Sequence, residues 1–311
     1  MPPSLASSLK RLPGVSGWIR SPGWQRLRHR WTLLSARRHS YPFTEFARLP
    51  TQLRALAGPV LDFVGIPAGR PLRIVVIGCS NGAEPYSIAS VLLRERPDVP
   101  FEILAFDLDT ALLDAARAAR YTREEATHHP ALPAGFVEST FDFIAGDVIA
   151  GDVIAGDVIA GPGSDPTYVV KPAIREKVAF AQADALDPEL VRKVGIADVV
   201  FAQNFLYHLG PRDSTLAFHN LAQCLAPRAA LFLDGCDLAL RHRWTRQRSL
   251  EPLDFEIEAI HAEALRERGV AIHTSTGAWS RSIAAAPIGS VGMERSSYMA
   301  AKRRCRPERG P

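Results

Sequence analysis

Residues 74–90 read IVVIGCSNGAEPYSIAS, an apolar run that passes through a turn into a helix-forming stretch. The run 74–77 predicts a buried strand. Gly78 and Gly82 allow the backbone to turn tightly and to approach a ligand closely. Pro85 suits the first turn of a helix, where a backbone N–H would have no partner. The stretch therefore predicts a strand, a tight turn and a helix whose first N–H groups face an anionic part of a ligand.

The same alternation of strand and helix continues along the chain. Short apolar runs predict strands, and amphipathic stretches predict helices between them. Buried strands separated by helices are typical of a parallel sheet that is covered on both faces, which is an α/β fold. We expect strands over 73–77, 102–106, 177–181, 197–201 and 230–233, and helices over 85–95, 110–120, 214–225 and 254–268.

The turn after the first strand restricts the class of ligand. It does not spell GxGxxG, which argues against a dinucleotide dehydrogenase, and it lacks GK[ST], which excludes a P-loop. Asp107 ends the next strand, the usual position of the acid that binds ribose hydroxyls. The residues alone therefore predict a site for a cofactor that contains adenosine.

Five stretches in order resemble motifs of one family. The stretch GCSNGAEPYSIAS at 78–90 resembles the GCSxGEEPYS signature of the CheR-type chemotaxis receptor glutamate methyltransferases, which use S-adenosyl-L-methionine. The other four are TEFAR at 44–48, AFDLDT at 105–110, VAFAQADAL at 178–186 and AQNFLY at 202–207. The resemblance covers about residues 41–236 and implies a class I methyltransferase fold, a Rossmann-like, mostly parallel, seven-stranded sheet with helices on both faces.

The resemblance also implies the site residues. Arg48 would face the methionine carboxylate, where a guanidinium can make two parallel hydrogen bonds. The implied catalytic residues are Arg48, Asn204 and Tyr207, although Tyr207, like Tyr86, also fits a packed aromatic role; no metal is expected. Asp109 is interpreted as a helix N-cap. The implied cofactor-binding residues are Thr44, Arg48, Gly78, Ser80, Glu84, Asp107, Asp184, Ala185, Asn204 and Phe205.

The implied function is O-methylation of a glutamate carboxylate on a chemoreceptor-like protein. No general base is required, because a glutamate side chain is already ionised at neutral pH. Ala83 and Gln203 depart from the family motifs, which have Glu and Arg there, and both changes remove charge near the expected substrate. Two alternatives stay open: a methyltransferase of a small molecule or of another protein, and a cofactor-binding or interaction protein that has lost catalysis.

The chain divides into four expected parts. Residues 1–40 contain eight Lys or Arg and no acid, which is compatible with an acidic partner or a transit peptide but is interpreted as a disordered basic arm. A helical preface over 41–70 precedes a methyltransferase domain over 71–275, and 276–311 is expected to be a basic tail of low order. An insertion over 144–163 holds three copies of GDVIA, expected to lengthen a hairpin tip between arms at 136–143 and 167–172.

Composition excludes some classes of protein. The chain has 311 residues, 47% of them hydrophobic, but no run approaches the roughly 18 consecutive apolar residues of a membrane-spanning helix. Its four cysteines form no CxxC pair, which suits a reducing compartment and predicts a cytoplasmic protein. Membrane insertion and nucleic acid are not expected.

Overall fold

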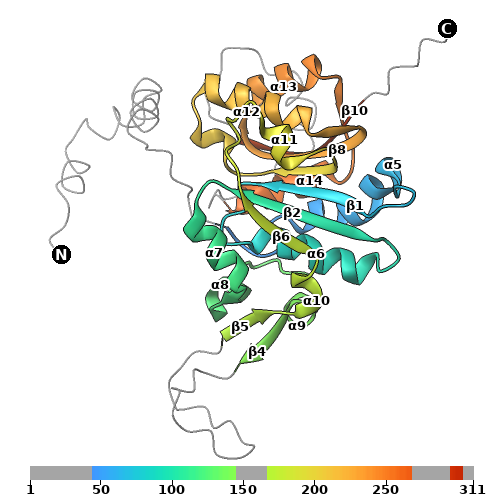
Figure 1. The fold of residues 1–311 in the computed structure, drawn as a ribbon. Coiled ribbons are helices and arrows are strands. Elements are labelled where there is room, and N and C mark those ends of the chain that lie inside the picture. Colours follow the sequence, from blue (N-terminus) through green and yellow to red (C-terminus); the bar gives the residue numbers. More distant parts are fainter. Residues whose placement is uncertain (1–43, 145–166, 268–294, 304–311) are drawn as a thin grey trace, which may run out of the picture.

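The computed structural model describes residues 44–144, 167–267 and 295–303 (Figure 1). A sheet forms its centre, made of β1 (Leu72–Ile77), β2 (Phe101–Asp107), β6 (Val178–Gln182), β7 (Ala197–Ala202), β8 (Leu225–Asp237), β9 (Leu250–Pro252) and β10 (Arg295–Arg303). The seven strands lie in the order β6-β2-β1-β7-β8-β10-β9. The pairs from β6 to β8 are parallel, whereas β10 is antiparallel to β8 and β9. This sheet confirms the predicted α/β class I methyltransferase fold.

Helices cover both faces of the sheet, as the apolar strands predicted (Figure 1). Side chains alternate along β1, so that Ile74 and Val76 enter one core cluster while Val75 and Ile77 enter the other. The first cluster lies under α4 (Pro50–Ala55), α6 (Ala83–Glu95), α7 (Thr110–Ala118) and α14 (Ile257–Glu267). The second lies under α11 (Leu190–Val194), α12 (Pro211–Gln223) and α13 (Leu238–Gln247).

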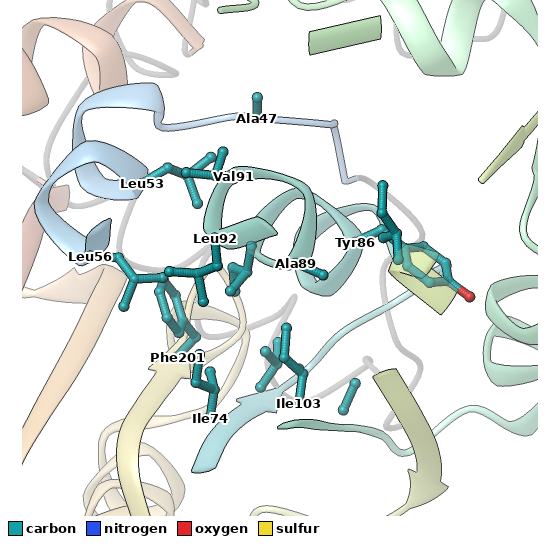
Figure 2. Close-up of a cluster of buried hydrophobic side chains, with 14 of the residues drawn as sticks. Ala47, Leu53, Leu56, Ile74, Tyr86, Ala89, Val91, Leu92, Ile103 and Phe201 are labelled. Carbon is teal, nitrogen blue, oxygen red and sulfur yellow. The ribbon is translucent and has the colours of Figure 1, made fainter. Parts of the chain in front are cut away.

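The expected helical preface is part of the first core cluster. Figure 2 shows Leu53 of the preface beside Val91 of α6 and Leu56 beside Leu92, with Ile74 and Phe201 of the sheet below them. All six side chains are buried. Burying a leucine side chain stabilises a fold by roughly 1.5–3 kcal/mol. Helix α4 and the turn that follows it are therefore packed firmly against α6 and the sheet.

Two prolines shape the preface: one begins its first helix and the other follows a kink. Pro50 is the first residue of α4, where it needs no N–H partner. The next turns, η1 (Leu56–Val60) and α5 (Leu61–Val64), contain Pro59, and Gly58 before it leaves the helical region at φ −112° and ψ −107°. Pro59 thus follows a kink within a continuous helical segment.

A small antiparallel sheet projects from the main one (Figure 1). It pairs β5 (Thr167–Val170) with β3 (Arg120–Tyr121) on one side and β4 (Phe141–Ile144) on the other. The two predicted arms do pair, but residues Phe136–Thr140 form helix α9 instead of strand, because Phe136 and Thr140, four residues apart, are both buried on one side. The GDVIA repeats lie outside the described residues. Two short helices flank this sheet, α8 (Arg123–Thr127) and α10 (Pro172–Arg175).

Two C-terminal strands and a helix were not predicted. Helix α13 and strand β9 lie between the predicted elements, and β10 lies in the segment that was expected to be a low-order tail. Within that segment, β10 pairs with β8 from Arg295 opposite Asp237 to Lys302 opposite Ala230. The sequence RSSYMAAKR has few β-branched residues, so its strand conformation depends on its two neighbours. The predicted basic arm and the rest of the tail lie outside the described residues.

Candidate active site

The turn after β1 has the geometry that its glycines predicted. The N–H groups of Gly78 and Cys79 both donate to the carbonyl of Phe106, at 2.8 and 3.0 Å. Gly82 caps α6 at φ +92°, and a Cβ there would lie 3.0 Å from the Cβ of Ala116. Any larger residue at Gly82 is therefore both strained and crowded. The turn brings the backbone and the start of α6 to the carboxyl edge of the sheet.

Asp107 holds this turn in place. It ends β2 and is 3% exposed, and its two carboxylate oxygens accept the N–H groups of Ser80, at 2.8 Å, and Asp109, at 3.0 Å. Asp109 caps α7 by accepting the N–H of Ala111 at 2.9 Å, which confirms its interpretation as an N-cap.

The surroundings of Ser80 indicate whether an adenosyl cofactor fits the turn after β1. Its hydroxyl is buried and has no hydrogen-bond partner in the described structure. A buried polar group without a partner costs about 1–3 kcal/mol. Ser80 lies in the same turn as Gly78, and its backbone N–H donates to Oδ2 of Asp107. The Ser80 hydroxyl can donate a hydrogen bond, the Asp107 carboxylate can accept one, and Gly78 has no side chain. These groups fit a ligand that carries hydroxyl groups.

A second polar cluster surrounds Arg48. Its Nη2 lies 3.4 Å from Oδ2 of Asp234 at the end of β8 and 3.3 Å from Oε1 of Gln203, which follows β7. Gln203 in turn donates through Nε2 to Oε1 of Gln52 in α4. The cluster thereby joins the preface to the ends of two neighbouring strands.

Asn204 lies between the acid and the guanidinium of this cluster. In the amide orientation that satisfies its neighbours, Nδ2 donates to Oδ2 of Asp234 at 3.0 Å and Oδ1 accepts from Nη2 of Arg48 at 2.6 Å. Its backbone is left-handed at φ +56°, and its N–H donates to the carbonyl of Asp234 at 3.2 Å. Asn204 is therefore fixed through both its backbone and its side chain.

Glu84 adds a second carboxylate to the electrostatics of the cluster. Burial at the start of α6 raises the pKa of Glu84 to about 7, the charge of Arg48 lowers it and the charge of Asp234 raises it. The side chain therefore changes charge near neutral pH. Such a group is sensitive to any ion that binds beside it.

Sequence reasoning missed Asp234. It follows the apolar run 229–233 and carries no motif, yet it is completely buried. The available signal was its position, because polar residues at the carboxyl ends of parallel strands face the ligand site of α/β folds. The run 230–233 was predicted as a strand, and Asp234 is the first polar residue after it.

The remaining predicted residues have less distinctive surroundings. Oδ1 of Asp184, after β6, accepts the N–H of Leu186 at 2.9 Å, and the carbonyl of Ala185 accepts from Asn220 at 2.9 Å. The ring of Phe205 lies 3.2 Å from where a Cβ on Gly78 would be. Thr44, at the start of the described chain, is partly buried.

Tyr86 and Tyr207 are the two tyrosines for which a packed aromatic role was considered. The hydroxyl of Tyr86 donates to the carbonyl of Ala116 at 2.9 Å, and its ring packs on Phe180, which confirms it as a packed aromatic. Tyr207 lies in the turn Leu206–His208, and its side chain is outside the described part of the structure.

In the three described segments, no group of three or more His, Cys, Asp or Glu side chains is placed to hold a metal ion. Within the same segments, no helix has both the length and the apolar character needed to cross a membrane.

Comparison with known proteins agrees with the motifs. Residues 42–142 match the family model described as CheR methyltransferase, SAM binding domain. Chemotaxis protein methyltransferase 2 of Vibrio cholerae is 30% identical over 194 residues, which cover 61% of this chain and 60% of that protein. The probable biofilm formation methyltransferase WspC of Pseudomonas aeruginosa is 28% identical over 218 residues, covering 69% of this chain and 46% of that protein. The predicted resemblance and the predicted cofactor, S-adenosyl-L-methionine, are thereby confirmed at the level of this domain.

A solved structure is similar at much lower identity. The plantazolicin methyltransferase BpumL in complex with SAH is 9% identical, covers 78% of this chain and 63% of its own, and has a TM-score of 0.33. The fold assignment therefore rests on the order of the strands, and the matched part of this chain spans only about half the length of the curated relatives, 60% and 46% of the two above.

Proposed function

We propose that this protein is an S-adenosyl-L-methionine-dependent methyltransferase that O-methylates a glutamate carboxylate on a chemoreceptor-like protein. The observation that carries the proposal is the turn after β1, inside the segment that matches the SAM binding domain. There Ser80 donates its backbone N–H to the Asp107 carboxylate, and its buried hydroxyl has no partner among the described residues. The names of the relatives support the acceptor, since two of them are a chemotaxis methyltransferase and a biofilm formation methyltransferase.

Each half of the cofactor has a cluster whose chemistry fits it. The turn at Gly78 and Ser80, with Asp107, suits the adenosyl ribose, and the Arg48 guanidinium suits the methionine carboxylate. Glu84 suits the cationic amino group. Asp184, Ala185, Asn204 and Phe205 would border the adenine and the transfer site, and Thr44 would adjoin Arg48.

The chain's contribution to the reaction is positioning. S-adenosylmethionine supplies a methyl group on a positively charged sulfur. Transfer to a carboxylate removes two opposite charges, so a protein gains most by aligning the groups and by excluding water. Arg48, Asn204 and Tyr207 are the proposed catalytic residues because they border the carboxyl ends of the strands, where acceptor and cofactor would meet.

The acceptor and the compartment belong to the same proposal. Gln203 is buried and neutral and is bonded to Gln52 and Arg48. It therefore offers no charge to an acidic acceptor, an observation that favours testing small-molecule acceptors as well. Among the described residues, the thiols of Cys79 and Cys224 are free and buried, which supports a reducing, cytoplasmic location.

Transfer of label tests the acceptor. Incubating the full chain with methyl-labelled S-adenosylmethionine and chemoreceptor-containing membranes should give protein label that is released by base, because methyl esters hydrolyse in base. Base-stable label would contradict a glutamate ester, and label found only on added small molecules would favour the alternative acceptor.

Asp107→Ala tests the cofactor site. Loss of charged hydrogen bonds costs about 1–3 kcal/mol, so affinity for S-adenosylhomocysteine should fall by roughly 10-fold to 100-fold in calorimetry. Asp109→Ala is the matched control, because it removes only the N-cap of α7 and should lower the free energy of unfolding by about 1 kcal/mol without a comparable loss of affinity. Unchanged affinity in Asp107→Ala would contradict a ribose role.

A further inference from the structure

The polar cluster at Arg48 contains an acid that no sequence motif assigns. Asp234 is 0% exposed and ends the described run of apolar residues in β8. A carboxylate buried without a partner is very costly, so it must be paired and hydrogen-bonded to remain ionised. Arg48 supplies the opposite charge, and its side chain is itself only 9% exposed.

Three polar side chains hold the end of the Arg48 side chain. Its Nη2 lies 3.4 Å from Oδ2 of Asp234 and 3.3 Å from Oε1 of Gln203. Asn204 bridges the two charges, bonding to Oδ2 of Asp234 and to Nη2 of Arg48. The direction of the guanidinium therefore depends on residues that follow β7 and on Asp234 of β8.

The segment that carries Arg48 depends on these contacts for its position. Ala47, just before it, is left-handed at φ +47°, and its N–H donates to the hydroxyl of Ser87 at 2.8 Å. Gln203 is bonded to Gln52 on the other side of Arg48 along the chain. The backbone is thus fixed at two points, and the end of the long arginine side chain is fixed by β8.

The geometry points to Asp234 as a positioning residue that, with Gln203 and Asn204, aims the Arg48 guanidinium at the carboxylate of the bound cofactor. This inference rests on the proposed binding of S-adenosylmethionine at the site. According to this inference, Asp234 of β8 increases the affinity for the cofactor indirectly, because it orients Arg48.

The charge of Asp234 also reaches Glu84. The charged groups that influence this carboxylate are Arg48 and Asp234, and the Cys79 thiol is electrostatically linked to it. Removing the negative charge of Asp234 should let the pKa of Glu84 fall from about 7 toward its ordinary value. Affinity for a ligand with a cationic amino group rises as Glu84 ionises, so the midpoint of that rise should move to lower pH.

Calorimetry of the full chain with S-adenosylhomocysteine tests the inference. Wild-type protein is titrated first across pH 5.5 to 8.5, and a lack of binding there would contradict the proposed function itself. With wild-type binding established, Asp234→Asn should lower affinity by about 10-fold, the effect of losing one charged hydrogen bond. The pH midpoint should also move down, and Asp234→Glu should recover part of the affinity.

Asp198→Asn is the matched control. Asp198 is also a buried aspartate on a central strand and is paired with an arginine. It lies near the amino end of β7, away from the polar cluster, where Nη1 and Nη2 of Arg70 donate to it at 2.6 and 2.8 Å. Its loss should destabilise the fold without changing affinity or the pH midpoint. Equal losses of affinity in the two variants, or wild-type affinity and midpoint in Asp234→Asn, would overturn the positioning role.

Discussion

The two ends of the sheet each carry a buried aspartate beside an arginine, and the two pairs differ. At the amino end, Asp198 receives two short bonds from Arg70, whose side chain is 50% exposed, and a third from the N–H of Arg73 at 2.9 Å. At the carboxyl end, Asp234 shares Arg48 at 3.4 Å with two amides. The first pair is bidentate and its arginine is half exposed to water, whereas in the second pair both the arginine and the aspartate are buried.

The difference agrees with the general placement of function in α/β folds. Strand ends at the carboxyl edge face ligands, and β1 and β7 are neighbours at which the order of strands reverses. An ion pair at the amino edge of the sheet contributes only to the stability of the fold. Matched substitutions at the two arginines therefore separate stability from ligand binding.

Arg48→Met should have the largest effect. It removes the cation that lies 3.4 Å from the buried Asp234, and breaking one side of a buried ion pair costs about 3–5 kcal/mol of the free energy of unfolding. Affinity for S-adenosylhomocysteine should be lost as well. Urea denaturation and calorimetry measure the two quantities, and a stable variant that still binds would show that Arg48 serves neither.

Glu84→Gln should have an intermediate, pH-dependent effect. The pKa of Glu84 is raised from 4.5 to about 7, so the unfolded chain loses its proton first and the folded state loses stability as pH rises from about 4.5 to about 7. The glutamine variant lacks this loss, so at pH 8 it should be more stable than wild type by up to about 3 kcal/mol.

Denaturation at pH 8 and at pH 4.5 checks the Glu84 prediction. The advantage of the variant should be present at the higher pH and absent at the lower one. Ligand affinity at pH 8 should fall, because the carboxylate that would face the cofactor's amino group is gone. A variant whose stability advantage does not change with pH would contradict the raised pKa.

Arg70→Met should have the smallest effect. Its guanidinium is half exposed, and exposed ion pairs contribute about 0–1 kcal/mol. Asp198 keeps the N–H of Arg73 as a partner. Stability should therefore change by about 1 kcal/mol or less and ligand affinity should not change, and a large loss of affinity would erase the contrast between the two edges.

Much of the molecule could be predicted from the sequence because its signals are local. The apolar runs in β1, β2 and β7, the glycines of the turn and the N-cap at Asp109 each depend on a few neighbouring residues. The motifs likewise assigned to one site residues that are distant in the chain, such as Ser80 after β1 and Asp107 at the end of β2. The structure joins these two by a hydrogen bond. Local steric and burial preferences suffice for such features.

Other features required tertiary structure, because their energy comes from partners far away in the chain. Strand β10 has a weak sequence signal and exists by pairing with β8 and β9. Residues Phe136–Thr140 resembled a strand arm but form a helix, and Asp234 became part of the site only when Arg48 was folded against it from 186 residues away. The sequence by itself determined the order of elements, the glycine turn and the cofactor class. Only the folded chain decided which charges meet, since ion pairs and strand ladders depend on distances that no short stretch of residues contains.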